Sequence, residues 1–351
     1  MASLKAIDFF CSIGGMTYGF RKAGINVIAG IDVDHSCKET YEFNNPHSKF
    51  IEADIKKYSF EQLEKDTGIK KSCNQLVFIG CSPCQYWSIM NTDKTKSMLS
   101  KNLLEDFQKF VEYFKPGYVV VENVPGIMRR ENESGLKKFI ELLEILGYTV
   151  KKDVLNTNYF GVPQRRRRFT LIASRVNKKI DLPKPNKSDF PTVRQFIGAK
   201  NGFDKITAGH FDDSDFMHTT AKLNEKNLKR IKRVSHNGGS RQEWENDSDL
   251  QLECYKKLEK GFSDIYGRMS WDKPAPTITT KFHSLSNGRF GHPDENRAIS
   301  LREGATLQTF PKGYVFKEKS IGKVAKHIGN AVPPEFAKRI GLIINKGENH
   351  E

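Results

Sequence analysis

The sequence predicts an α/β fold, in which crossover helices connect a parallel sheet, together with a second and smaller domain. In the first half of the chain, short β-branched or aromatic runs alternate with longer amphipathic segments. After Arg175 the composition shifts to Lys, Pro, Asn, Asp and Gly, with many turn-forming residues and little periodicity. A length of 351 residues accommodates one large core and a smaller domain.

Each element follows from its local pattern. Short apolar runs predict five strands, at residues 6–10, 27–31, 49–52, 76–80 and 118–122. Apolar residues at helical spacing predict helices over 103–114 and 135–146, and residues 148–156 and 168–174 then form a closing pair of strands. Residues 322–344 predict a helix broken around Pro333 and Pro334, which we expect to pack on the first domain.

Composition indicates the class of partner. The chain has 57 Lys and Arg against 42 Asp and Glu, a formal charge of +15, which favours a polyanion such as nucleic acid. A basic protein kept soluble by its charge is the simpler alternative. No apolar run approaches the roughly 18 residues of a membrane span, and Asp8 interrupts the N-terminal apolar stretch, so we expect a cytoplasmic protein. Its six cysteines are too few for a disulfide scaffold.

Three segments at predicted strand ends have the composition of a nucleotide-binding edge. Gly14 and Gly15 follow the first strand and precede a helix, which permits close approach of backbone to a ligand, although a tight turn explains them equally well. Asp32 ends the second strand, where a carboxylate accepts hydrogen bonds from ribose hydroxyls or caps a helix. Asp54 closes the third strand in a similar position.

The segment GCSPCQYWS, where the fourth strand ends, carries the most reactive side chains. Cys81 and Cys84 are compatible with a redox pair, half of a zinc site, or one nucleophile with an incidental neighbour. No second CxxC or paired His spacing completes a zinc site, and the context of a redox pair is poor. A thiolate at Cys84, after Pro83, suits nucleophilic catalysis, whereas a buried inert thiol is the alternative.

Two further segments place charge at the same sheet edge. In YVVVENV an apolar strand delivers Glu122 and Asn123, and a partly buried carboxyl there suits protonation of a ring nitrogen. In QRRRRF the alternation of a strand would point Arg166 and Arg168 together. A loop-capping Glu and a solvated charge run are the simpler explanations.

With these segments in this order, the chain resembles the cytosine-C5 DNA methyltransferases of bacterial restriction-modification systems. LREGATLQTFP and IGNAVPP match two C-terminal motifs of that family. The resemblance implies a Rossmann-like, S-adenosylmethionine-dependent methyltransferase sheet in a catalytic domain of residues 1–178 and 300–346, and a smaller target-recognition domain of residues 179–299. Ser12 stands where the family usually has Gly, and Tyr86 and Trp87 where Pro and Phe are common.

The resemblance also assigns residues to roles. Those expected in catalysis are Cys84, Glu122, Asn123, Arg166 and Arg168. Those expected to bind S-adenosylmethionine are Phe10, Ile13, Gly14, Gly15, Asp32, Val33, Asp54, Ile55, Pro83, Leu103, Asn330, Ala331 and Val332. Those expected to contact DNA are Gln85, Gln164, Asn237, Gly238, Gly239, Ser240, Arg241, Thr277 and Thr279.

The implied reaction begins when the Cys84 thiolate adds to carbon 6 of a flipped-out cytosine while Glu122 hydrogen-bonds the N3 side. Carbon 5 then takes the methyl group of S-adenosylmethionine, and no metal is expected. Expected partners are double-stranded DNA and a restriction endonuclease of the same specificity, with the enzyme a monomer on DNA in a prokaryotic or phage-encoded setting. A cytosine-C5 tRNA methyltransferase, a catalytically silent DNA-binding protein and a thiol-disulfide oxidoreductase using Cys81 and Cys84 are the alternatives.

Overall fold

The chain is divided into two compact units. The computed structural model describes residues 3–82, 102–188, 190–252 and 264–348. The first unit comprises residues 1–160, 167–185 and 331–351, and the second comprises residues 161–166 and 186–330. The second unit is therefore larger than the 179–299 expected, because residues 300–330 belong to it. Among the described helices, none has the length and apolar composition needed to cross a membrane.

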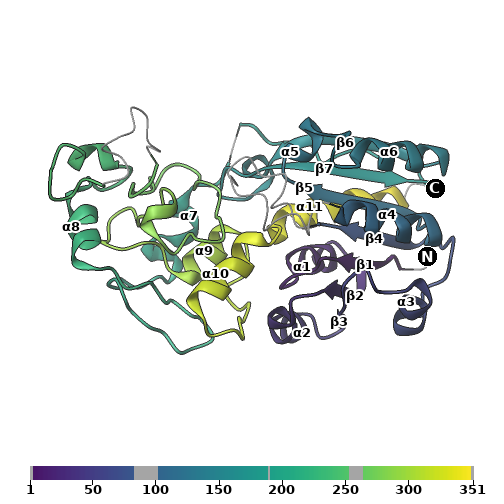
Figure 1. Cartoon of the computed structure of the whole chain (residues 1–351), viewed down its shortest axis with the longest axis horizontal. Helices are drawn as coiled ribbons and strands as arrows, with labels where there is room; N and C mark the ends of the chain where they lie inside the picture. The colour runs from purple at the N-terminus through teal and green to yellow at the C-terminus, as the bar shows by residue number, and fades with distance from the viewer. Residues whose placement is uncertain (1–2, 83–101, 189, 253–263, 349–351) are drawn as a thin grey trace. The chain divides into compact units, whose positions relative to one another are not determined.

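The first unit is built on one seven-stranded sheet of order β3-β2-β1-β4-β5-β7-β6 (Figure 1). The strands are β1 Lys5–Phe9, β2 Asn26–Asp32, β3 Lys49–Glu52, β4 Leu76–Gly80, β5 Tyr118–Asn123, β6 Thr149–Asn156 and β7 Arg167–Ser174. β1 to β5 are parallel, whereas β7 runs antiparallel between β5 and β6. The predicted α/β class and all seven predicted strands are confirmed.

Helices complete this unit: α1 Gly15–Lys22, α2 Lys38–Asn44, α3 Phe60–Thr67, α4 Leu103–Phe114, α5 Gly126–Arg129, α6 Leu136–Ile145 and α11 Pro334–Glu348. β4 and β5 are buried along their whole length, as central strands with apolar runs should be. Helix α11 packs against α1. Their approach requires Gly19, because a Cβ there would lie 2.4 Å from the Ala337 Cβ.

The predicted C-terminal helix is two helices in different units. α10 (Ile321–Asn330) ends the second unit, and α11 begins at Pro334, whose missing N–H and fixed φ suit the first turn of a helix. The expectation that this segment packs on the first domain is confirmed for α11, which contacts α1. For α10 it is wrong, because α10 packs on α9 (Leu301–Leu307) within the second unit.

The second unit is held together by buried arginines as well as by apolar contacts. Its other helices are α7 Val193–Ile197 and α8 Glu225–Arg233, and its described remainder consists of loops, 3-10 turns and isolated bridges. Arg268 is fully buried, and its five N–H groups donate to five uncharged oxygens. Four of these oxygens are backbone carbonyls, those of Ile231, Val234, His292 and Glu295. One side chain therefore joins segments that have no sheet to join them.

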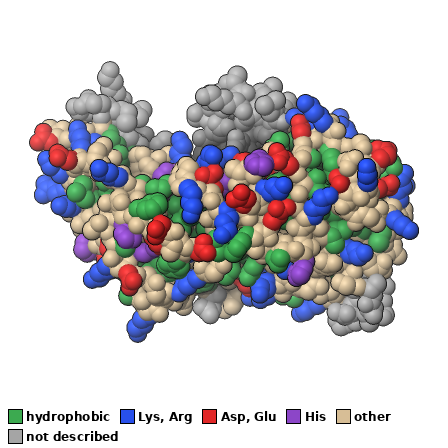
Figure 2. Space-filling model, turned by 90° about the horizontal axis from the view of Figure 1, so that it is seen from below, with side chains coloured by type: hydrophobic (Ala, Val, Ile, Leu, Met, Phe, Trp, Pro, Cys, Tyr) green, Lys and Arg blue, Asp and Glu red, His purple; other side chains and the backbone are tan. Residues whose placement is uncertain are grey.

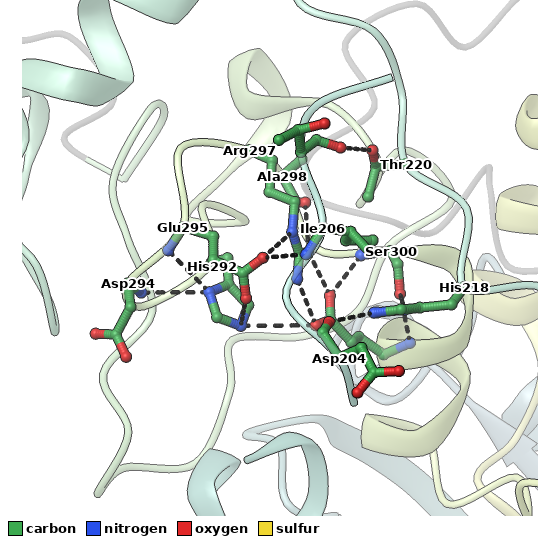
Figure 3. A network of polar contacts seen from close by, with 12 residues as sticks. Asp204, Ile206, His218, Thr220, His292, Asp294, Glu295, Arg297, Ala298 and Ser300 are labelled. Atoms are coloured by element: carbon green, nitrogen blue, oxygen red, sulfur yellow. Dashed lines mark hydrogen bonds and ion pairs between the residues drawn. The ribbon is translucent and has the colours of Figure 1, made fainter. Parts of the chain in front are cut away.

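A second buried arginine forms an ion pair with α9. Arg297 binds both carboxylate oxygens of Glu303, at 2.7 and 2.8 Å, and neither side chain is exposed. Burial alone would raise the pKa of Glu303, but Arg297 and His292 outweigh it and lower that pKa to about 2. The Nδ1 atom of His292 accepts two backbone N–H groups, and Ser300 caps α9 (Figure 3). The geometry is bidentate, which gives the pair both energy and direction.

Candidate functional site

The loop after β1 has an unusual backbone. Phe10, Ser12 and Gly14 all have positive φ, at 63°, 47° and 88°. Gly14 precedes the first residue of α1, and the loop is further fixed by the hydrogen bond from Gly14 N–H to the Cys11 carbonyl, 2.8 Å. A left-handed Ser12 explains why Gly is usual at this position in the family. The Ser12 hydroxyl lies 3.8 Å from the Cys37 sulfur, so its side chain packs on the 3-10 turn His35–Cys37 that follows β2.

Asp32 ties this loop to the end of β2. Its carboxylate accepts the Ser12 N–H at 2.8 Å and the Asp34 N–H at 2.9 Å. Burial raises the pKa of Asp32 above its ordinary value, and these two hydrogen bonds oppose that rise. Val33, directly after it, is 68% exposed. An apolar side chain is thus presented to solvent beside a carboxylate that still has free lone pairs.

The C-terminal segment closes on the same loop. A Cβ at Gly15 would lie 2.3 Å from the Val332 carbonyl oxygen and 3.4 Å from the Ala331 Cβ, so only glycine fits there. Ala331 and Val332 are both buried. Asn330, the remaining residue predicted in this segment, is exposed at the end of α10 and belongs to the second unit.

The other predicted cofactor residues line the neighbouring strand ends. Asp54 follows β3 and is partly exposed, with one carboxylate oxygen accepting the Lys56 N–H at 3.1 Å. Ile55 is buried in the hydrophobic core of this unit, and Phe10 and Leu103 are partly buried against that core. Ile13 is fully buried, so its side chain packs inside the protein and does not face solvent.

These features fit S-adenosylmethionine. The ligand carries a sulfonium and an ammonium cation, a ribose with two hydroxyls, and a flat adenine ring. The described edge offers the carboxylates of Asp32 and Asp54, a glycine-bounded loop with close backbone approach, and the exposed Val33. Asp32 and Val33 are the residues that the sequence predicts to bind this ligand, and here they present a carboxylate and an exposed apolar side chain next to each other.

A buried polar chain beneath the loop was not predicted from the sequence. Asp8 in β1 is fully buried and accepts both the N–H and the hydroxyl of Thr17 in α1, at 3.1 and 2.7 Å. The Thr17 hydroxyl also contacts the Tyr41 hydroxyl at 3.0 Å, which contacts Ser48 at 2.7 Å. The feature of the sequence that could have revealed this chain is Asp8, an acidic residue inside a mostly apolar strand. The chain fixes the first turn of α1 directly behind the cofactor loop.

The end of β5 fixes the segment that leads to the predicted nucleophile. The Asn123 side-chain amide donates to the Ser82 hydroxyl at 3.1 Å and to its carbonyl at 3.4 Å, and Asn123 Oδ1 accepts the Val124 N–H. Ser82, which the sequence analysis missed, immediately precedes Pro83. The predicted residues Pro83, Cys84 and Gln85, together with Tyr86 and Trp87, lie outside the described residues.

Glu122 and Arg168 form the charged pair of this edge. The Glu122 carboxylate lies 3.1 Å from the Arg168 Nε, and the two side chains are 6% and 14% exposed. They come from adjacent antiparallel strands, β5 and β7, in which Glu122 is opposite Thr170. The contact is an ion pair rather than an aligned hydrogen bond, and in this largely dehydrated position the attraction between carboxylate and guanidinium is screened little by water.

The QRRRR segment alternates between buried and exposed side chains. Gln164 and Arg166 are buried, whereas Arg165 and Arg167 are exposed. Arg166 donates to the carbonyls of Ile278 and Gly329, at 3.0 and 3.1 Å. Buried and exposed side chains therefore alternate from Gln164 to Arg167, as the sequence predicts. Arg166 belongs to the second unit, however, whereas Arg168 belongs to the first.

The prediction that Gln164 contacts DNA conflicts with its position. Its side chain is fully buried, donates to the Leu307 carbonyl and the Gln308 side chain, and accepts the Ile278 N–H. An amide whose oxygen and nitrogen are both bonded to protein has no access to a base edge. Gln164 therefore links the segment around residue 278 to the segment at residues 307 and 308 within the second unit.

The loop predicted to enter the major groove is tied into the protein. Asn237 Oδ1 accepts the Trp271 N–H, and Ser240 forms a capping box with Glu243. The carbonyls of Gly238 and Gly239 accept a guanidinium N–H of Arg289, and the Arg241 guanidinium lies 3.4 Å from Glu245. These contacts fix the conformation of the loop. Among the five residues predicted to contact DNA here, Asn237 is exposed and the other four are partly buried.

The two threonines predicted to contact phosphate differ. The Thr277 hydroxyl donates to the Arg165 carbonyl at 2.7 Å, so its only proton is already used and a phosphate oxygen would find no donor there. Thr279 is partly exposed and makes no side-chain hydrogen bond to another described residue, so it retains the predicted capacity.

Comparisons with known proteins agree with this arrangement. The family model of C-5 cytosine-specific DNA methylases matches residues 4–346. The chain is 38% identical to the Type II methylase M.HgiDII of Herpetosiphon aurantiacus, over 97% of this chain and 94% of that protein. It is 30% identical to the Type II methyltransferase M1.HphI of Haemophilus parahaemolyticus, over 99% and 88%.

A solved structure also shares the fold. It is a candidate DNA modification methyltransferase encoded within an Escherichia coli prophage, with a TM-score of 0.74, 20% identity, and coverage of 99% of this chain and 100% of that one. The thiol-disulfide interpretation of Cys81 and Cys84 has no such support, since family and fold agree on one class. The chain belongs to the family of C-5 cytosine-specific DNA methylases.

Proposed function

We propose that this protein methylates carbon 5 of a cytosine within a specific double-stranded DNA sequence, with S-adenosylmethionine as the methyl donor. The family match over residues 4–346 supports the reaction class. The observation that carries the residue assignment is the Glu122–Arg168 pair, because Glu122 directly precedes Asn123 on β5 and Asn123 fixes the entry to Cys84 through Ser82. A tRNA substrate has no specific observation in its favour.

The reaction assigns a separate task to each residue of the edge. The Cys84 thiolate adds to carbon 6 of the target cytosine, while Glu122 hydrogen-bonds N3 and stabilises the charge that develops on the ring. Arg168 holds the Glu122 carboxylate and lies beside the base oxygen O2. After carbon 5 has gained the methyl group, loss of its proton and expulsion of Cys84 restore the ring. The target base must first leave the stacked duplex.

S-Adenosylmethionine supplies an electrophilic methyl group when bound. Asp32 orients the ribose, Val33 packs on the adenine, and the loop from Phe10 to Gly15 bounds the methionine end. Burial of the Glu122–Arg168 pair keeps water from weakening the contacts to the base.

Covalent trapping tests the proposal. Duplex DNA containing 5-fluorocytosine should form a denaturation-resistant adduct with the wild type when the donor is present, because fluorine cannot leave as the proton does. Cys84→Ser should form none. Glu122→Gln should trap at least about 100-fold more slowly, the usual cost of losing a positioned proton donor. Cys81→Ser, the matched control, should trap like the wild type. Absence of an adduct with DNA known to contain the target site would refute the proposal.

The biological setting is part of the proposal. Relatives named as Type II methyltransferases support a role in protecting host DNA beside an endonuclease of the same specificity. Expression in a host without cytosine methylation, followed by sequencing of 5-methylcytosine, identifies the target. Plasmid from that host should resist a nuclease that cleaves the same sequence. Genomic DNA without the mark would exclude the DNA assignment.

A further inference from the structure

Helix α8 presents a basic face to solvent that the reaction does not use. Lys226, Lys229, Lys232 and Arg233 are all exposed on this nine-residue helix. Figure 2 shows Lys and Arg side chains over the end of the second unit that carries α8 in Figure 1. At helical spacing these four residues lie on adjacent rows of one face, so the charges point the same way.

The opposite face of α8 is anchored firmly. Ile231 is buried in a hydrophobic cluster of the second unit. Arg230 donates to the Leu250 carbonyl at 2.7 Å, and its guanidinium lies over the rings of Trp244 and Tyr266, at 5.4 and 5.2 Å. Arg230 and Ile231 therefore anchor the helix to the rest of the second unit. Arg230 takes part in this anchoring, whereas the four exposed cations do not.

The exposed lysines are not explained by internal contacts. Within the described part of the chain, Lys226, Lys229 and Lys232 make no hydrogen bond or ion pair. Arg233 has only a long surface contact with Asp247, 3.7 Å. Like charges three and four residues apart repel one another on this face, whereas the two cations of the last turn, Lys232 and Arg233, interact favourably with the helix dipole. Its arrangement suits an anionic partner.

We propose that the basic face of α8, defined as Lys226, Lys229, Lys232 and Arg233, binds the phosphate backbone of duplex DNA. This rests on the proposed function, because the DNA is the methylation substrate. The row from Lys226 to Arg233 rises about 10 Å along the helix, and one DNA strand carries a phosphate about every 3.4 Å of its axis. The face therefore matches a short run of phosphates. It positions the protein without reading sequence.

The salt dependence of binding tests this directly. The probe is a fluorescein-labelled duplex of mixed sequence, titrated with the full-length protein. Each phosphate contact contributes about −0.9 to the slope of log K against log salt. Replacing Lys226, Lys229 and Lys232 together by Ala should reduce the slope by about 2.7. Between about 50 and 200 mM salt, the variant should then lose about 40-fold less affinity than the wild type.

The control removes the same charge elsewhere. Lys137, Lys138 and Lys151 are exposed residues of α6 and β6, and their triple Ala variant should keep the wild-type slope. Ala is a strong helix former and removes the repulsion, so unfolding of α8 would not explain a loss. Equal slopes for all three proteins, or equal reductions in both variants, would overturn the inference. A wild type that traps 5-fluorocytosine DNA while the slopes are equal would leave the proposed function standing.

Discussion

Asp8 provides the sharpest test of how the first unit is built. Burial raises the pKa of its carboxyl from the ordinary value of 3.8 to about 7, against the opposing hydrogen bonds from Thr17. Its Oδ1 atom has no hydrogen-bond partner among the described residues. The folded protein therefore holds a proton on Asp8 over a pH range in which the unfolded chain has already lost it.

The sign and size of the effect follow. Between pH 3.8 and about 7 the native state binds more protons than the unfolded state, so the free energy of unfolding falls as pH rises. A shift of about 3 units corresponds to roughly 4 kcal/mol at 1.36 kcal/mol per unit, of which about 2.5 kcal/mol falls between pH 5 and 8. Asp8→Asn removes this dependence while keeping the shape of the side chain.

Urea unfolding of wild type and Asp8→Asn at several pH values gives the measurement. The difference in unfolding free energy should move by about 2.5 kcal/mol in favour of the variant from pH 5 to pH 8. Asp213→Asn, at an exposed position of the second unit, controls for the loss of one carboxylate. A difference between Asp8→Asn and wild type that stays constant across this range would refute the reasoning.

Three further changes test other parts of the structure. Ser12→Gly should raise the unfolding free energy by up to about 1 kcal/mol, because Ser12 has a φ of 47°; a fall in the thermal midpoint would contradict this. Arg297→Met should cost about 3–5 kcal/mol in urea unfolding by leaving Glu303 buried and unpaired, and the double change with Glu303→Leu should recover most of it; additive losses would exclude the buried pair as the cause. Arg166→Ala should reduce the methylation rate more than general DNA affinity, because Arg166 braces backbone instead of contacting solvent; equal losses in both assays would indicate a plain charge effect.

The strands were predictable because local pattern and tertiary position agree. In the run at residues 118–122 three consecutive valines precede Glu122, and the structure buries all of β5. The strand order at the sheet end was not predictable. β7 lies between β5 and β6 through antiparallel pairing, which depends on long-range contacts rather than on the sequence of either strand.

The candidate site was predictable where residues follow strands and less so where contacts are remote. Glu122 and Asp32 lie at strand ends, so their common edge follows from parallel topology. Gln164 looked equally suited to DNA, yet the structure buries it against residues 307 and 308, some 140 positions away in the chain. The residues next to Gln164 in the sequence give no indication of such a contact. Arg297 and Glu303 were likewise not singled out from the sequence, although the structure buries both completely.

Arg268 bears on how freely the surface of the second unit can change. The carbonyls it binds are present whatever side chain stands at those positions, so its interior contacts specify backbone geometry and not residue identity. Exposed side chains next to these carbonyls, those of Lys232 and Arg233, can therefore be exchanged while the same guanidinium holds the loops. A library that randomises those exposed positions and keeps Arg268 should retain folded members. The second unit should thus tolerate sequence change at its exposed positions while its loops keep their geometry.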